Sequence, residues 1–185
     1  MTLLKLLGLI NSISMILTPF ILMRRDRLFN KDTKAISHLG GLKRTARTFK
    51  LFLLITGLLE YIFVMVVIFT FGVTNFTFSI PILSVTLVST LAAALLNTKE
   101  HPREHYIAAI FTFVSAGLGG FVMSLEYARL SNLSPLSIVV IIISSLLFSS
   151  LLMGRKHLTL PANKELIFIV ILVLLNLAYT VALFS

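Results

Sequence analysis

The sequence predicts an all-α protein, a polytopic membrane protein built as an antiparallel bundle of six transmembrane helices. Of its 185 residues, 57% are hydrophobic and only 12% are charged, and the mean hydropathy is +1.01, which is too apolar for a soluble domain of this size. The apolar residues fall in runs of about 20, the length that a helix needs to cross hydrocarbon about 30 Å thick. Cys is absent, which excludes a disulfide framework and a Cys nucleophile.

Six apolar segments are expected to span the membrane within one domain, 1–185. They are residues 3–23, 49–72, 79–97, 105–127, 135–153 and 165–184. The first segment could alternatively be a signal peptide, but its stronger charge follows the apolar run and no small-residue cleavage site precedes the basic cluster. We therefore expect it to remain as a membrane span.

The long hydrophilic segment 24–48 is predicted to be a basic, solvated loop that faces lipid head groups. All but two of the 16 Lys and Arg residues lie in or beside the loops after the first, third and fifth spans, the exceptions being Lys5 and Arg129. The positive-inside rule places these loops in the cytoplasm and both termini outside the cell membrane. Because the basic residues crowd beside apolar spans, we expect anionic membrane lipids as partners and no nucleic acid.

A carboxylate interrupts the second span. Glu60 lies about ten residues into that span, so at about 1.5 Å per residue it is near the middle of the bilayer. Asn11 and Asn176 lie at a similar depth in the first and last spans, and Tyr179 is one helical turn beyond Asn176. A carboxyl group in hydrocarbon is costly unless it is paired, so these four residues are expected to form an intramembrane polar cluster. The cluster either lines a binding pocket or fastens the helices together by hydrogen bonds.

The candidates at the cytoplasmic face are Ser37, His38, His101 and His105. His101 and His105 are four residues apart, the spacing that lets two imidazoles on one helix face share a metal ion. Two ligands do not complete a metal site, so we predict no metal and no cofactor, with this pair as the candidate if a metal is bound. Hydrogen bonding at the membrane interface or contact with head groups is the favoured role.

Three short motifs resemble a known family. Ile36-Ser37-His38-Leu39-Gly40 precedes the second span, Thr56-Gly57-Leu58-Leu59 lies within it, and His105-Tyr106-Ile107-Ala108-Ala109 opens the fourth. The arrangement resembles the six-span prokaryotic membrane proteins of domain-of-unknown-function family 998, which is similar in pattern to the DRAM/Sfk group. The resemblance implies a six-span architecture along the whole chain and no particular reaction. The heavily basic first loop departs from the pattern and leaves its sidedness in question.

These features predict an integral membrane protein that binds or handles a lipid or another amphiphile in an intramembrane polar pocket. Two alternatives stay open: a membrane-embedded, metal-assisted hydrolase that uses His101 and His105, and a structural or assembly subunit of a membrane complex. No nucleophile is evident beside Glu60, so no catalytic residue is identified and an enzyme is less favoured. The sequence leaves the ligand and the oligomeric state open.

Overall fold

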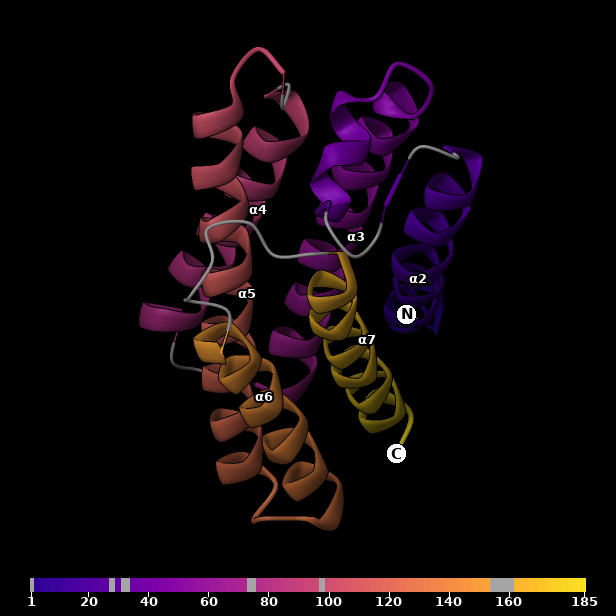
Figure 1. The fold of residues 1–185 in the computed structure, drawn as a ribbon. Helices are drawn as coiled ribbons and strands as arrows, with labels where there is room; N and C mark the ends of the chain where they lie inside the picture. Colours follow the sequence, from indigo (N-terminus) through magenta and orange to yellow (C-terminus); the bar gives the residue numbers. More distant parts are fainter. Residues whose placement is uncertain (1, 27–28, 31–33, 73–75, 97–98, 154–161) are drawn as a thin grey trace.

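The computed structural model is mostly helical in the part of the chain that it describes. This part is the whole chain except residues 1, 27–28, 31–33, 73–75, 97–98 and 154–161. The elements in order are α1 Thr2–Lys5, α2 Leu7–Arg25, the 3₁₀ helix η1 Ile36–Gly41, α3 Ala46–Phe71, α4 Phe76–Leu95, α5 Pro102–Leu130, α6 Pro135–Met153 and α7 Ala162–Phe184 (Figure 1). The predicted all-α class is therefore confirmed, and a helix covers most of each apolar segment named above.

Four helical segments are long and apolar enough to cross a membrane, by length and composition. They are Leu3–Arg25, Ala46–Phe71, Pro102–Leu130 and Glu165–Phe184, and two shorter apolar helices cover Ile80–Leu95 and Pro135–Ser149. Large apolar side chains are exposed on the outer faces of these helices, among them Ile55, Phe69 and Val88. Extensive apolar surface of this kind is typical of helices that face lipid.

Helices α2 to α7 pack as a closed ring. Each helix packs against its neighbour in the sequence, and α7 returns to pack against α2. The core inside the ring includes Phe63, Val67 and Leu147, which are almost fully buried. At Gly8 a Cβ atom would lie only 2.5 Å from the Phe63 ring and from Thr180 Oγ1. Glycine at this position therefore lets α2 approach both α3 and α7 closely.

The segment between α2 and α3 is not the fully solvated loop that we expected for 24–48. Ile36 and Leu39 of η1 are buried and belong to a second core cluster with Leu22, Phe49 and Ala162. The two residues are three positions apart, so they lie on one face of a 3₁₀ helix. The basic side chains of Lys43, Arg44 and Arg47 in the same segment are exposed. The segment is thus amphipathic, with its apolar face docked on the helices.

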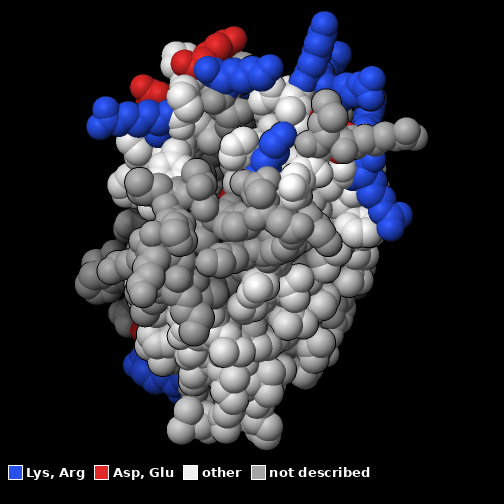
Figure 2. Space-filling view, viewed as in Figure 1, with Lys and Arg blue, Asp and Glu red and all other residues white. Residues whose placement is uncertain are grey.

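Basic side chains gather at one end of the molecule. Figure 2 shows Lys and Arg over the end where the α2–α3 segment and the α4–α5 connection lie, with mostly uncharged surface below them. Toward the other end of α5, Arg129 lies 3.6 Å from Glu126. The described surface therefore has a strongly basic end and a largely apolar middle.

Candidate functional site

Glu60 is held by two amide groups from neighbouring helices. Its Oε2 atom accepts a hydrogen bond from Asn11 Nδ2 of α2 at 2.6 Å and another from Asn176 Nδ2 of α7 at 2.7 Å. Both asparagines are buried. These donors offset part of the cost of placing a carboxyl group among apolar helices. The structure thus brings together three of the four residues that we expected in the polar cluster.

Tyr179 belongs to a different contact, which corrects its expected pairing with Glu60. Its hydroxyl lies 3.1 Å from Ser124 Oγ of α5, and its ring packs edge-on against Tyr127 with the ring centroids 6.0 Å apart. Asn176 and Tyr179 are three positions apart on α7, so they are offset around the helix axis. Asn176 meets α2 and α3, whereas Tyr179 meets α5.

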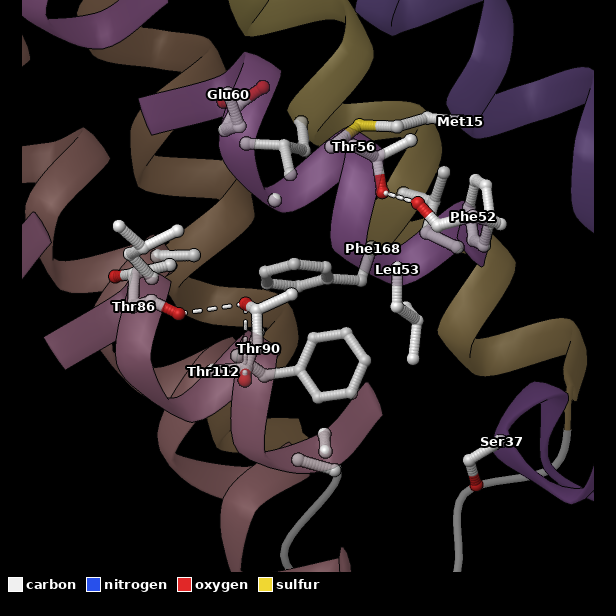
Figure 3. Close-up of a pocket in the computed structure, with 18 of the residues that line it drawn as sticks. Met15, Ser37, Phe52, Leu53, Thr56, Glu60, Thr86, Thr90, Thr112 and Phe168 are labelled. Carbon is white, nitrogen blue, oxygen red and sulfur yellow. Dashed lines mark hydrogen bonds between the residues drawn. The ribbon is translucent and has the colours of Figure 1, made fainter. Parts of the chain in front are cut away.

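A cavity of about 160 Å³ lies among α3, α4, α5 and α7, and we call it the inner cavity. Its wall is almost entirely apolar and includes the rings of Phe52, Phe113 and Phe168. Glu60 and Ser37 also line it, and Figure 3 shows these two residues at opposite ends of the view. The cavity therefore runs from the Glu60 cluster toward the docked α2–α3 segment.

Threonine hydroxyls of the inner cavity are satisfied by the helices that carry them. Thr56 Oγ1 donates to the Phe52 carbonyl at 2.7 Å, and Thr90 Oγ1 donates to the Thr86 carbonyl at 2.7 Å (Figure 3). Thr112 Oγ1 lies 3.0 Å from the Ala108 carbonyl in the same geometry. Since these hydroxyl protons are already engaged, the wall presents methyl groups and acceptor oxygens to an occupant. The inner cavity thus suits an apolar occupant.

A wider cavity of about 550 Å³ lies at the basic end, and we call it the outer cavity. Cationic side chains line it, namely those of Lys34, Lys99 and Arg103, and His38 lies beside them. The residues that line both cavities are Ser37, His105, Ala109, Phe113 and Glu165. The two cavities therefore adjoin and share one wall.

His105 stands in this shared wall with only 5% of its surface exposed. Its Nδ1 atom is 3.1 Å from the Leu96 carbonyl. A carbonyl only accepts hydrogen bonds, so Nδ1 carries a proton, and in the neutral ring Nε2 keeps a lone pair. Within the described part of the chain, the buried Nε2 atom has no hydrogen-bond partner. Leaving a buried polar atom unpaired costs about 1–3 kcal/mol of stability, so a ligand that donates a hydrogen bond to this nitrogen would recover part of that cost.

His101 does not share a face with His105. Helix α5 begins at Pro102, and His101 precedes it with φ −131° and ψ 59°, outside helical geometry. The helical spacing rule therefore does not apply to this pair, and His101 is exposed whereas His105 is buried. Among the described residues, there is no group of three or more His, Cys, Asp or Glu side chains placed to hold a metal ion. Of the four candidates at this face, Ser37, His38 and His105 line cavities.

Glu165 is the residue of the site that the sequence analysis missed. It lies in the first turn of α7, is buried, and its Oε2 atom accepts a hydrogen bond from the Ile36 backbone N–H at 2.5 Å. At the first residue of α7, the Ala162 backbone N–H donates to the Lys34 carbonyl at 2.8 Å. The start of α7 thus fixes the segment that separates the two cavities. The available signal was an acidic residue directly before an apolar run, which sequence alone also explains as an ordinary helix start.

The fold and the site define an all-α protein with membrane-type helices around an apolar cavity, which has a carboxyl group at one end and a basic cavity at the other. Comparisons with family models, with curated protein sequences and with solved structures found no match. The resemblance to family 998 therefore rests on the short motifs alone. Three residues of those motifs, Ser37, His105 and Ala109, stand in the wall that the cavities share.

Proposed function

We propose that this protein is an integral membrane protein that binds an anionic amphiphile, with the tail in the inner cavity and the head group in the outer cavity. The observation that carries the proposal is the shared wall, which joins a nearly apolar cavity to one lined by cationic side chains. An amphiphile has the same two-part character. Ligand sites of this kind are mostly apolar with a few placed polar groups.

The outer cavity favours a negatively charged head group. Lys34, Lys99 and Arg103 place positive charge around it, and a guanidinium group matches the geometry of phosphate or carboxylate oxygens. In the inner cavity, Phe52, Phe113 and Phe168 offer apolar contacts to a tail. A tail that enters from lipid or detergent already lies in an apolar medium, so packing against these rings and the charge around the head group supply the affinity.

The proposal includes a placement in the membrane. All six long helices would span it, because the ring puts α4 and α6 between helices that are long enough to cross. The basic end would face the cytoplasm and both termini the outside, as the positive-inside rule predicts, and the basic end seen in Figure 2 supports this orientation. Anionic lipid head groups would then lie beside the mouth of the outer cavity. The six-span plan is also the one that the resemblance to family 998 implies.

The test is native mass spectrometry of the full chain in detergent, with hexadecyl phosphate as the probe. The wild-type protein should bind one molecule. Ala109→Phe fills the shared wall and should abolish this adduct, whereas Val114→Phe adds the same bulk at an exposed position of α5 and should leave it intact. Arg103→Ala should weaken binding by about threefold, the size expected for one exposed charge pair. Arg129→Ala is the matched control at the other end of α5.

Three results would count against the proposal. If the wild-type protein binds no hexadecyl phosphate and carries no co-purified lipid, the Glu60 cluster only fastens helices and a structural subunit becomes the better description. Equal binding by Ala109→Phe and Val114→Phe would show that the probe lies elsewhere. Equal losses in Arg103→Ala and Arg129→Ala would show that the head group does not occupy the outer cavity.

A further inference from the structure

We infer that the bound amphiphile carries a hydroxyl group between its anionic head and its tail, and that this hydroxyl donates a hydrogen bond to His105 Nε2. The inference rests on the proposed function and specifies the ligand of the same site. It depends on three observations: the position of His105, the proton on its ring, and the lack of a partner for Nε2 in the described part of the chain.

The position of His105 selects one part of the ligand. The residue lines both the inner and the outer cavity. A ligand whose tail fills one cavity and whose head fills the other must pass the wall that they share. The atoms opposite His105 are therefore those that link head to tail.

The state of the ring selects the chemistry of that link. Nδ1 donates to the Leu96 carbonyl at 3.1 Å, so Nε2 is an acceptor and requires a donor from the ligand. A cationic donor is disfavoured here, because Lys34, Lys99 and Arg103 line the adjoining cavity. An ether or ester oxygen has no proton to donate. A hydroxyl group is neutral, small and able to donate, and it therefore fits the site.

The orphaned nitrogen supports a ligand role over a packing role. Only 5% of the surface of His105 is exposed, and its Nε2 atom has no hydrogen-bond partner among the described residues. Buried polar atoms are nearly always paired in folded proteins. The bond from Nδ1 to the Leu96 carbonyl accounts for one ring nitrogen, and Nε2 is the nitrogen that this bond leaves unexplained. A ligand hydroxyl would give Nε2 the hydrogen-bond donor that it lacks among the described residues.

The test compares two probes that differ only in the hydroxyl group. Hexadecyl glycerol phosphate has a free hydroxyl between the phosphate and the chain, and hexadecyl propanediol phosphate lacks it. The wild-type protein in detergent should bind the first about three- to tenfold more tightly, the range expected for the net gain of one hydrogen bond.

Two variants of His105 separate the acceptor from the structural bond. His105→Asn keeps an amide N–H at the position of Nδ1, and with it the bond to Leu96, but has no acceptor at the position of Nε2. It should bind both probes equally, at the level of the weaker wild-type complex. His105→Gln can place a carbonyl oxygen near the position of Nε2 and should recover part of the preference.

The outcomes distinguish this inference from the function on which it rests. If the wild-type protein binds both probes equally well, the hydroxyl inference is wrong and the amphiphile site stands. If His105→Asn still prefers the probe with the hydroxyl group, the hydroxyl inference is also wrong, because a group other than Nε2 would then accept the hydrogen bond. If neither probe binds to the wild-type protein, the proposed function itself fails.

Discussion

Replacing Glu60 by leucine should destabilise the protein by leaving two buried amides without their acceptor. Glu60 Oε2 accepts hydrogen bonds from Asn11 and Asn176 at 2.6 and 2.7 Å. Interhelical hydrogen bonds in membrane proteins average about 0.6 kcal/mol each, so the pair is expected to contribute about 1.2 kcal/mol. Donors left unpaired in a buried site cost about 1–3 kcal/mol each, which sets the upper end near 6 kcal/mol.

The measurement is thermal unfolding of purified protein in detergent, followed by circular dichroism of the helices. With about 2–4 °C per kcal/mol for a chain of this size, even the lower figure lowers the Tm of Glu60→Leu by about 2–5 °C. Glu60→Gln should stay within about 2 °C of the wild type, because the carbonyl oxygen of glutamine can take the place of Oε2. Leu58→Ala, at an exposed position of the same helix, is the control and should change little.

A triple variant separates the loss of the two hydrogen bonds from the cost of the unpaired amide donors. Changing Asn11, Glu60 and Asn176 together to leucine removes the donors along with the acceptor, and replacing all partners of a buried network by apolar groups is nearly neutral. The triple variant should therefore be more stable than Glu60→Leu alone. If it is less stable, or if Glu60→Gln loses as much as Glu60→Leu, the stabilising role assigned to these two hydrogen bonds is wrong.

Two further predictions concern packing and the docked segment. Gly8→Ala places a methyl group 2.5 Å from the Phe63 ring and from Thr180 Oγ1. Overpacking should therefore cost about 1–3 kcal/mol of stability and lower the Tm. An unchanged Tm would show that α2 can shift to make room for the methyl group. Glu165→Leu removes the acceptor of the Ile36 N–H, so hydrogen exchange at this amide should accelerate about tenfold for each 1.4 kcal/mol lost, while the amides in the middle of α5 keep their protection. Unchanged exchange at Ile36 would mean that other contacts hold the segment.

The helices were predictable because the requirement for burial in lipid is strong and simple. Apolar runs of about 20 residues with prolines at the starts of α5 and α6 locate the helices to within a few residues. The meeting of Glu60 with Asn11 and Asn176 followed from their depth along separate helices, since a buried carboxyl requires donors. Depth did not give the direction in which a side chain points, and Tyr179 therefore turned out to contact α5.

The cavities and the docking of η1 could not be read from the sequence. They depend on how far neighbouring helices separate and on contacts between residues remote in the chain, such as Ile36 and Glu165. Charge dominated the sequence pattern of 24–48, although two apolar residues, Ile36 and Leu39, determine where its middle packs. The spacing of His101 and His105 was misleading because the helix begins between them.

The attachment of the α2–α3 segment to α7 has a consequence for biogenesis. Ile36 and Glu165 are 129 positions apart, yet their contact holds the wall between the two cavities. A chain made from the N-terminus toward the C-terminus presents Ile36 long before Glu165 exists. The early helices can pair in the meantime, but the wall between the two cavities stays incomplete until α7 joins the ring. Assembly of the last helix and completion of this wall are thus one event.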